Sequence, residues 1–409
     1  MNTRFMQLVD YWIGVPVCAL LTIWDFVIAK RFFSQENPTP RKVLFIELSE
    51  MGTAVTSYSS LYQISNQFEN TERFFLIFVS NAESVEILNE IPKKNILTIN
   101  SRSLLALIIS TFVTLRHIRS LKFDTVIDME LFSRFSSILS YLSGAINRVG
   151  FYQFAGEGLF RGKFMTHPVS FNPNHHISIN LLSLIFSLKA SRHEVPLLKK
   201  NISDKLIPLP KYKLTQEENL KAFDLIRQIN PSISSQSPLI IVNGYPGEYL
   251  PLRGWPVDYY QELVKQLLNQ DQELFIILTG LTKATKFNQQ IAATVDNDRC
   301  IDITGKTRSI KDLINLYGLA RVLVATDGGS AHFASLTDIH TVVLFGPGDP
   351  ETWSPISNKK TVLYSHLSCS PCLTAHNHRH SICSDNQCMQ TISVEQVYSA
   401  VLSAYQNNS

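Results

Sequence analysis

The amino-acid sequence predicts an α/β protein with two domains, each built around a doubly wound parallel sheet. Its 409 residues are enough for two full hydrophobic cores. Short apolar runs alternate with segments of helical periodicity in both halves of the chain, which is typical of parallel sheets flanked by helices. The proline-bearing segment from Leu206 to Lys213 separates the two series and is the expected linker.

The first 40 residues differ in composition from the rest of the chain. Tyr11 to Ala29 is apolar apart from Asp25 and is followed by Lys30 and Arg31. Asp10 before the run and the two basic residues after it are not the pattern of a cleaved signal peptide. We expect a helix that lies on a membrane surface, with a spanning helix and a soluble packing helix as the alternatives. Either membrane arrangement leaves the body of the protein in the cytoplasm.

The first half then shows the alternation expected of a doubly wound sheet. Apolar runs of four to six residues predict strands, and apolar residues at helical spacing predict helices. The expected strands are Val43 to Leu48, Phe74 to Val79, Ile96 to Ile99 and Thr125 to Asp128, and the expected helices are Ser57 to Phe68, Leu104 to Leu121 and Phe132 to Leu142. The pair His175-His176 is expected at a helix start, because no third ligand is spaced to complete a metal site.

The second half repeats the same logic. The expected strands are Leu239 to Val242, Phe275 to Thr279, Ile301 to Ile303, Val322 to Ala325 and Thr341 to Phe345. The expected helices are Val257 to Leu268, Lys283 to Val295, Ile310 to Ala320 and, at the end of the chain, Val394 to Tyr405. Ser309 has the position of a helix cap, with Asp312 three residues later.

A glycine-bearing turn between two buried strands is the strongest candidate for a binding site. Asp327, Gly328 and Gly329 follow a strand, and Ser330, Ala331 and His332 begin a short helix. A turn with exposed backbone N–H groups and the positive end of a helix together favour an anion, most often phosphate. The alternative is an ordinary βαβ unit whose glycines only tighten the turn.

The run Asp327 to His332, followed by an apolar strand, Phe345 to Pro350 (Phe-Gly-Pro-Gly-Asp-Pro) and Trp353, resembles glycosyltransferase family 9. These are the heptosyltransferase-like enzymes of bacterial cell-surface polysaccharide assembly. The resemblance covers residues 41 to about 400. It implies a GT-B fold, in which two Rossmann-like domains face a cleft and a C-terminal helix packs back across it.

The resemblance also implies the division of the chain and its function. Residues 1–40 are then a membrane-associating helix and linker, 41–207 the acceptor domain, 208–390 the donor domain, and 391–409 a C-terminal helix and tail. The expected enzyme is inverting and needs no metal for catalysis. It moves heptose or a related sugar from a nucleotide-diphosphate donor to a lipopolysaccharide-core or other lipid-linked glycan, at the cytoplasmic side of the inner membrane.

The donor site follows from the same resemblance. The basic residue ahead of a Trp-Pro pair approaches the donor diphosphate in the family, and here it is Arg253. Thr304, which follows a strand together with Gly305, lies where nucleoside contacts fall. The implied donor-binding residues are Arg253, Thr304, Asp327, Gly328, Gly329, Ser330, Ala331 and His332.

The catalytic base is where this chain departs from the family. The family presents an aspartate in the loop after the first strand, and this chain has Thr53 there. A threonine hydroxyl is too weakly acidic to act as a carboxylate-like base, so we expect Glu130, and after it Glu50, to take the proton. The alternative for each is a solvated or salt-bridged surface carboxylate. If the base is lost, the protein is a catalytically inactive, membrane-associated nucleotide-sugar-binding protein.

Basic residues around a glycine-rich and aromatic segment are candidates for acceptor binding. Arg148, Arg161 and Lys163 lie in or next to the segment from Gly144 to Lys163. Arginine forks match phosphate oxygens, so these residues are expected to bind a phosphorylated, lipid-linked acceptor. The alternative is a flexible surface loop whose charges serve solubility.

Four of the six cysteines cluster near the C-terminus: Cys369, Cys372, Cys383 and Cys388. This spacing suits tetrahedral zinc, and it also suits reduced thiols or two disulfides. A cytosolic enzyme keeps its thiols reduced, so structural zinc and free thiols are weighed equally, ahead of disulfides.

Composition and the first glycine-containing loop argue against several other classes of protein. The chain is 45% hydrophobic and 17% charged, which is the composition of a globular protein. A formal charge of +3 without a basic run predicts no nucleic-acid partner, although it suits an anionic membrane face. A Rossmann oxidoreductase is not expected either, because Gly52 stands alone after the first strand where a G-x-G-x-x-G pattern would begin.

Overall fold

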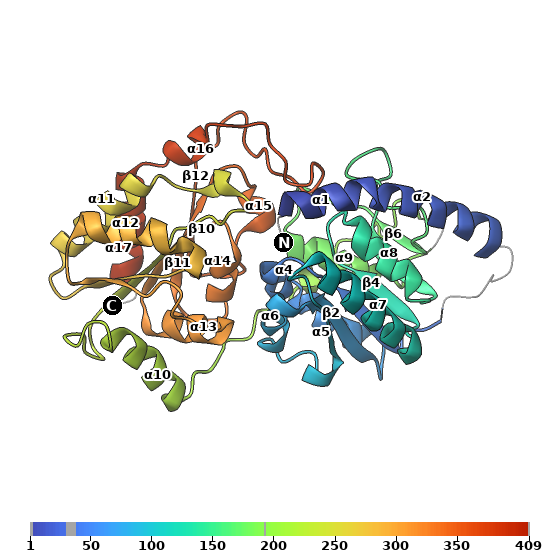
Figure 1. Cartoon of the computed structure of the whole chain (residues 1–409), viewed down its shortest axis with the longest axis horizontal. Helices are drawn as coiled ribbons and strands as arrows, with labels where there is room; N and C mark the ends of the chain where they lie inside the picture. The colour runs from blue at the N-terminus through green and yellow to red at the C-terminus, as the bar shows by residue number, and fades with distance from the viewer. Residues whose placement is uncertain (1–2, 30–37, 192–193, 408–409) are drawn as a thin grey trace. The chain divides into compact units, whose positions relative to one another are not determined.

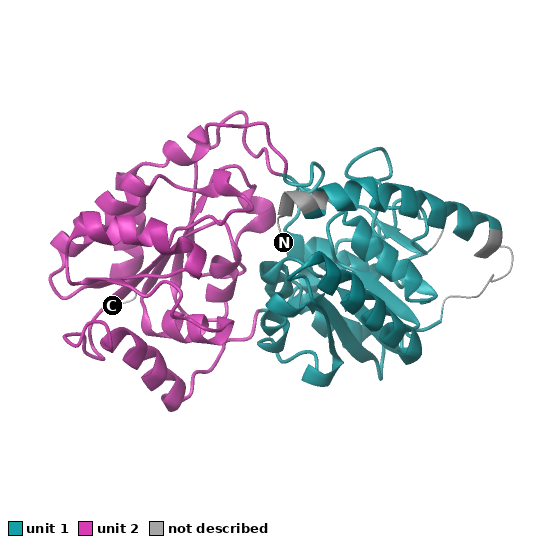
Figure 2. Ribbon diagram, viewed as in Figure 1, with its two compact units in different colours: residues 1–208, 374–379 teal, residues 209–373, 380–409 magenta. Residues whose placement is uncertain are grey.

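The computed structural model describes residues 3–29, 38–191 and 194–407, which form two compact units. Unit 1 contains the chain up to Pro208 together with Thr374–Arg379, and unit 2 contains Leu209–Leu373 and the chain from His380 onward (Figure 2). Each unit is a parallel sheet with helices on both faces (Figure 1). The segment Thr374–Arg379 therefore leaves unit 2, joins unit 1 and returns.

The sheet of unit 1 has the strand order β3-β2-β1-β4-β5-β6, with all neighbours parallel. Its strands are β1 (Lys42–Ile46), β2 (Glu72–Phe78), β3 (Ile96–Ile99), β4 (Thr125–Asp128), β5 (Asn147–Phe151) and β6 (His167–Val169). Ile46 pairs with Leu76 of β2 and with Asp128 of β4. The loops after β1, β2 and β4 therefore share one edge of the sheet, where ligands bind in this class of fold.

The helices of unit 1 are α1 (Thr3–Trp12), α2 (Gly14–Trp24), the π-helical turn η1 (Asp25–Ala29), α4 (Met51–Thr56), α5 (Tyr58–Gln67), α6 (Glu83–Glu86), α7 (Leu104–Leu121), α8 (Arg134–Leu142) and α9 (Ile177–Ser187). On one face, Ile118 of α7 and Leu139 of α8 pack on sheet residues such as Val126. α2 packs on α8, and a Cβ at Gly14 would lie 2.7 Å from the Cβ of Arg134, so only glycine permits this approach.

Two sequence-based expectations for unit 1 have clear outcomes. His176 precedes α9, and its Nδ1 accepts a hydrogen bond from the backbone N–H of Ser178 at 3.2 Å, which confirms the helix start. The segment from Gly144 to Lys163 is not only a loop, because it contains β5.

The sheet of unit 2 has the order β12-β11-β10-β7-β8-β9, again with all neighbours parallel. Its strands are β7 (Leu239–Asn243), β8 (Phe275–Leu278), β9 (Cys300–Asp302), β10 (Val322–Thr326), β11 (His340–Phe345) and β12 (Lys360–Tyr364). Its helices are α10 (Gln216–Arg227), α11 (Val257–Gln270), α12 (Thr285–Val295), α13 (Ile310–Leu319), α14 (Gly329–Ala334), α15 (Pro350–Trp353), α16 (Gln387–Gln390) and α17 (Val394–Asn407). Ser309 caps α13, as expected, by accepting a hydrogen bond from the N–H of Asp312 at 3.0 Å.

The C-terminal helix α17 belongs to the core of unit 2. Val397 and Val401 are fully buried in one apolar cluster with Leu263 of α11 and Val342 of β11. The apolar stripe of this helix is thus covered within unit 2. Its expected packing back across the cleft stays a prediction.

Candidate functional site

The glycine loop, defined as Asp327–His332, lies at the carboxyl end of the central strand β10 in unit 2. Gly328, Gly329 and Ser330 are half-exposed, whereas Asp327, Ala331 and His332 are buried. The loop that follows β11 packs against it closely, because a Cβ at Gly348 would lie 2.6 Å from Oδ2 of Asp327. The half-exposed backbone of this loop is thus available to an anion, while its flanking residues fix its position.

Arg253 is held directly against the glycine loop. Its Nη1 donates a hydrogen bond to the carbonyl oxygen of Asp327 at 3.0 Å, and its Nε lies 3.2 Å from Oδ2 of the same residue. Both side chains are largely buried. Asp327 therefore positions the guanidinium of Arg253 beside the exposed glycines, as the grouping of these residues in the sequence predicted.

Thr304 organises the turn after β9. Its hydroxyl donates to Oδ1 of Asp302 at 2.5 Å and accepts a hydrogen bond from Nδ2 of Asn288 at 2.6 Å. Gly305 follows with a φ of +72°, a conformation that glycine adopts without strain. The turn is thus held by its own side chains at the same sheet edge as the glycine loop.

In unit 1, four acidic residues gather at the carboxyl ends of β1 and β4: Glu47, Glu50, Asp128 and Glu130. Glu130 is buried and accepts hydrogen bonds from the N–H groups of Leu48 and Ser49, at 2.8 and 3.0 Å, and from the Ser49 hydroxyl. Burial, together with the charge of Glu50, raises the pKa of Glu130 to about 7. Glu130 therefore holds the loop after β1 in place. Its expected role as the catalytic base stays a prediction.

The pKa values of the two neighbouring buried carboxyls, Glu47 and Asp128, are also raised. Burial raises the pKa of Glu47 well above its usual range, and the nearby charges of Glu130 and Glu50 add to this effect. Burial also raises the pKa of Asp128 to about 6, against the opposing charge of Arg161, with which it forms an ion pair. Burial thus disfavours the charged form of both carboxyls, and Arg161 opposes this effect at Asp128.

Glu50 is the carboxyl of this group that combines solvent access with oriented partners. Its side chain is 31% exposed. Thr53 donates its hydroxyl to Oε2 at 3.0 Å, and Arg379 approaches as a fork, with Nη1 2.6 Å from Oε1 and Nη2 donating to Oε2 at 3.0 Å. The guanidinium favours the ionised carboxylate and the hydroxyl limits its rotation. Thr53 therefore orients a carboxylate three residues earlier in the chain. Its place at the family's aspartate position stays a prediction.

Arg379 was not singled out from the sequence. It belongs to Thr374–Arg379, the part of the cysteine-containing segment that joins unit 1. His376 in the same segment contacts the rings of Phe132 and Phe171, with centroids 5.7 and 5.5 Å away. His378 and Arg379 have φ values of 55° and 56°, a strained conformation for non-glycine residues that often accompanies functional placement. This strained pair was not visible as a sequence pattern.

The acceptor-binding expectation needs correction for two of its three residues. Arg161 is 1% exposed and is used internally, because it pairs with Asp128 and its Nη1 donates to the carbonyl oxygen of Glu130 at 2.9 Å. Arg148 donates to the carbonyl oxygens of Phe164 and Ala145 at 2.8 and 2.9 Å and lies 3.4 Å from Asp25. Lys163 is exposed. The two arginines thus stabilise unit 1, since buried guanidinium groups need internal partners.

All four clustered cysteines, Cys369, Cys372, Cys383 and Cys388, are free thiols in the structure. Among residues 3–29, 38–191 and 194–407, no group of three or more histidine, cysteine, aspartate or glutamate side chains has an arrangement that holds a metal ion. Burial and the neighbouring thiols raise the pKa of Cys388 to about 11, which keeps this thiol protonated. Structural zinc at these cysteines stays a prediction.

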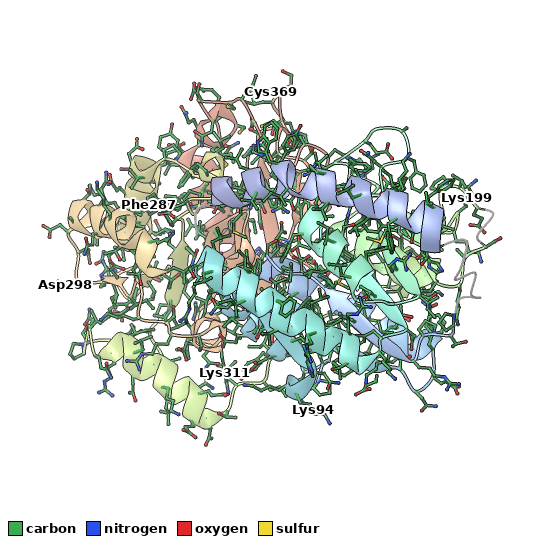
Figure 3. The ribbon with its side chains drawn as sticks, turned by 45° about the vertical axis from the view of Figure 1, so that its right-hand side comes forward. Lys94, Lys199, Phe287, Asp298, Lys311 and Cys369 are labelled. Atoms are coloured by element: carbon green, nitrogen blue, oxygen red, sulfur yellow. The ribbon has the colours of Figure 1, made fainter. Side chains whose placement is uncertain are left out.

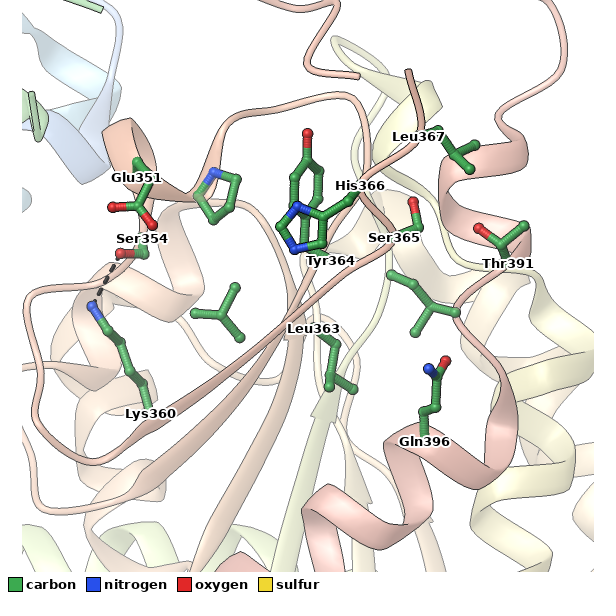
Figure 4. Close-up of a pocket in the computed structure, with 13 residues that line it drawn as sticks. Glu351, Ser354, Lys360, Leu363, Tyr364, Ser365, His366, Leu367, Thr391 and Gln396 are labelled. Carbon is green, nitrogen blue, oxygen red and sulfur yellow. Dashed lines mark hydrogen bonds between the residues drawn. The ribbon is translucent and has the colours of Figure 1, made fainter. Parts of the chain in front are cut away.

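A cavity of about 600 Å³ lies beside the edge strand β12 in unit 2 (Figure 4). Lys360, Tyr364, His366 and Gln396 are among the residues that line it. Lys360 donates a hydrogen bond to the Ser354 hydroxyl at 3.0 Å. The lining does not include Arg253 or the glycine loop, so the cavity is separate from the candidate anion site.

Comparison with known proteins agrees with this geometry. A family model described as glycosyltransferase family 9 (heptosyltransferase) matches residues 113–382. Lipopolysaccharide heptosyltransferase 2 of Salmonella typhimurium is 32% identical over 137 residues, which are 32% of this chain and only 38% of that protein. Lipooligosaccharide heptosyltransferase 2 of Campylobacter jejuni is 22% identical over 345 residues, 81% of this chain and 90% of that protein.

Solved structures extend the likeness to both units. ADP-heptose lipopolysaccharide heptosyltransferase II of E. coli matches with a TM-score of 0.68 at 18% identity, over 90% of this chain and 99% of that chain. The iron-containing dodecameric glycosyltransferase TibC of enterotoxigenic E. coli matches with a TM-score of 0.51 at 11% identity, over 92% and 78% of the two chains.

Two Rossmann-like units with parallel six-stranded sheets, and ligand loops at their carboxyl edges, define a protein of the GT-B class. The chain belongs to glycosyltransferase family 9, the heptosyltransferases, because the family model covers well over half of it.

Proposed function

We propose that this protein is an inverting glycosyltransferase that moves heptose or a related sugar from a nucleotide-diphosphate donor, such as an ADP-sugar, to a lipid-linked core glycan. Membership of the heptosyltransferase family supports the reaction class. The observation that carries the proposal is the oriented carboxylate of Glu50, with Thr53 and Arg379 as its partners, at the carboxyl edge of the sheet in unit 1.

In the proposed reaction, an acceptor hydroxyl attacks the anomeric carbon of the donor sugar. A new bond forms between that oxygen and the anomeric carbon, while the bond from this carbon to the diphosphate breaks. Glu50 takes the hydroxyl proton, a transfer that general bases typically accelerate by about a hundredfold or more. The nucleotide diphosphate leaves with the bonding electrons and carries the developing negative charge.

The glycine loop and Arg253 are proposed to stabilise the leaving diphosphate. The half-exposed backbone of Gly328 to Ser330 supplies fixed N–H dipoles, and Asp327 holds the guanidinium of Arg253 beside them. Positive groups that are already in place where charge develops perform the task that a divalent cation has in other transferases. We therefore propose catalysis without a metal ion, although the related structure of TibC contains iron.

Family membership also supports a proposal for the acceptor contact and the location. Lys163, which is exposed, remains the predicted basic contact of the acceptor in unit 1. The proposed site of action is the cytoplasmic side of the inner membrane, reached through the apolar N-terminal helices. A lipid-linked substrate requires the catalytic body to work close to a bilayer.

Binding of ADP, UDP and GDP, measured calorimetrically, tests the donor site. We expect one of them to bind in the presence of EDTA, and Arg253→Ala and Asp327→Ala each to weaken binding about tenfold or more, because charge-assisted hydrogen bonds are lost. Arg227→Ala is the matched control, because Arg227 is an exposed arginine on α10 in the same unit. If no nucleotide binds, the likeness extends only to the fold and the proposal fails.

Turnover tests the base. We expect Glu50→Gln to lower kcat by about a hundredfold or more with donor binding unchanged. Glu130→Gln is compared in the same assay, and a larger loss there would assign the base to Glu130. Donor binding without turnover by the unaltered chain on any lipid-linked acceptor would instead support the inactive nucleotide-sugar-binding protein.

A further inference from the structure

Large apolar side chains on the surface of the described residues concentrate on two helical segments of unit 1. Of the 23 exposed large hydrophobic residues in the part of the chain that the structure describes, 15 lie on α1, α2, the turn between them, η1 or α7. They are Leu8, Tyr11, Trp12, Ile13, Leu20, Ile23, Trp24, Phe26 and Val27 on the N-terminal helices, and Leu104, Leu105, Ile108, Ile109, Phe112 and Val113 on α7. Such a concentration marks an interaction surface, whereas single exposed apolar residues do not.

The N-terminal helices turn their acidic residues inward. Asp10 accepts hydrogen bonds from the N–H groups of Arg134 and Phe135 at 3.1 and 2.9 Å, and from Nη1 of Arg134 at 3.0 Å. Asp25 is buried and lies 3.4 Å from Nη2 of Arg148. Both charges are therefore neutralised within unit 1. The outer face of these helices keeps its aromatic and aliphatic residues and exposes neither carboxylate.

The helix α7 also exposes apolar residues on its outer face and no acidic residue. Its inner side packs on the core through Ile118, Leu107 and Leu115, while Phe112 and Val113 are 69% and 60% exposed. From Leu104 to Leu121 the helix has no acidic residue. Exposed basic residues flank its apolar part, namely Arg102 before it and Arg116 and Lys122 toward its end. An apolar face with basic flanks complements an anionic lipid surface.

The two segments lie on the same side of unit 1, with α8 between them (Figures 1 and 3). α2 packs on α8, and Nη1 of Arg119 on α7 donates a hydrogen bond to the carbonyl oxygen of Leu142 at the end of α8, at 2.8 Å. Met6 of α1, and Leu107 and Leu115 of α7, pack against the same buried cluster of unit 1. The apolar surfaces of both segments thus belong to one helical layer.

We infer that α1, α2, η1 and α7 together form a docking face for an anionic bilayer surface, in which the N-terminal helices lie on the membrane and do not span it. Both Leu8–Val27 and Leu104–Leu121 are long and apolar enough to cross a membrane. Crossing would, however, separate Asp10 and Asp25 from their arginines and leave Arg134 and Arg148 buried without them. Lying flat keeps these pairs and places Trp12 and Trp24 at the lipid interface.

The proposed location relies on the N-terminal helices alone, and α7 would be a second part of the chain that contacts the membrane. This contact does not depend on sugar transfer. Vesicle binding is measured without donor or acceptor. Nucleotide binding is measured without lipid. The two proposals therefore fail separately.

The first experiment is flotation of the full chain with vesicles of phosphatidylethanolamine and phosphatidylglycerol, compared with pure phosphatidylcholine. We expect binding to the anionic vesicles that weakens with salt. The double variant Phe112→Glu with Val113→Glu should bind about tenfold or more weakly, because two apolar groups no longer enter the lipid. The matched control is Leu220→Glu with Ile229→Glu, which changes exposed apolar residues of unit 2. Arg116→Glu should weaken binding to anionic vesicles alone.

Tryptophan fluorescence reports the depth of the N-terminal helices. Trp12 and Trp24 are 70% and 55% exposed, whereas Trp255 and Trp353 are buried in unit 2. We expect lipids brominated near the headgroup to quench the first pair more than lipids brominated at the chain ends.

Three results overturn the inference. The first is that the α7 double variant binds anionic vesicles as strongly as the control variant does, while circular dichroism and nucleotide binding show that it is folded. Another is stronger quenching from the centre of the bilayer, which would indicate a span. The third is a stable dimer by sedimentation without lipid that the α7 variant abolishes, because a second copy would then cover this face.

Discussion

At the scale of single residues, the central feature is the ion pair between Glu50 and Arg379, which are separated by 329 positions in the chain. The position of Glu50 after the first strand made it a candidate from sequence alone. Arg379 was not predictable, because no local pattern links a residue in a cysteine-containing segment to a loop in the first domain. The burial of Arg148 and Arg161 was equally hidden, since sequence does not show whether an arginine faces a ligand or an internal carboxylate.

We expect Arg379→Met to lower kcat about tenfold with little change in donor KM. The Glu50 carboxylate then loses its paired contacts with the guanidinium but keeps its position in the loop. Arg379→Lys should recover part of the rate, as a lysine supplies charge without the fork. Steady-state kinetics measure this, with Arg227→Met as the control. A kcat in Arg379→Lys no higher than in Arg379→Met would show that the positive charge at this position does not contribute to the rate.

Glu130 should make stability depend on pH. Burial raises the pKa of Glu130 in the folded chain to about 7, above the ordinary value of 4.5, so the folded state holds a proton that the unfolded state has released between these pH values. The free energy of unfolding should therefore fall as the pH rises from about 4.5 to about 7. Urea denaturation at pH 5 and pH 8 should show a smaller loss for Glu130→Gln than for the unaltered chain. Equal losses in both proteins would contradict the assignment.

At the scale of helices and strands, agreement with the sequence depends on how strong each local pattern is. Ile96–Ile99, Thr125–Asp128 and Leu104–Leu121 were predicted with the observed bounds, because each is a continuous apolar run or a long periodic one. β6 has three residues, β12 is a half-exposed edge strand, and α10 is largely polar, so none of them carries a strong apolar signal. These elements depend on tertiary packing, which the sequence pattern does not report.

The attachment of the N-terminal helices gives a prediction at this scale. Asp10→Ala should lower the free energy of unfolding of unit 1 by about 3 kcal/mol, because the largely buried Arg134 loses its partner and the first turn of α8 loses two acceptor contacts. Thermal or urea denaturation followed by circular dichroism measures the change. Glu69→Ala, at an exposed position of the same unit, should stay within about 0.5 kcal/mol. A similar effect of both variants would show that the pair contributes little.

At the scale of the whole molecule, the chain has two parallel sheets with separate cores, which the alternation of strands and helices in both halves predicted. Which residues belong to each unit was harder to predict from the sequence. Unit 1 ends at Pro208, which lies within the expected linker. No pattern in the sequence indicated that Thr374–Arg379 belongs to unit 1.

Two cores predict two unfolding events. The buried tryptophans Trp255 and Trp353 report on unit 2, whereas circular dichroism reports on both units. In Asp10→Ala we expect the circular dichroism transition to broaden or split toward lower urea. In a Trp12→Phe, Trp24→Phe background, the fluorescence midpoint of Trp255 and Trp353 should stay in place. A joint shift of both signals would show that the units unfold as one.

The passage of Thr374–Arg379 into unit 1 has a consequence for synthesis on the ribosome. The strands and helices of unit 1 emerge first and can form their sheet early, but Arg379 leaves the ribosome only after almost all of unit 2 has been made. Until then Glu50 lacks its guanidinium partner, and Phe132 and Phe171 lack the ring of His376. A prematurely terminated chain can thus possess a folded first sheet without the completed carboxylate site, so the proposed chemistry is reserved for nearly full-length protein.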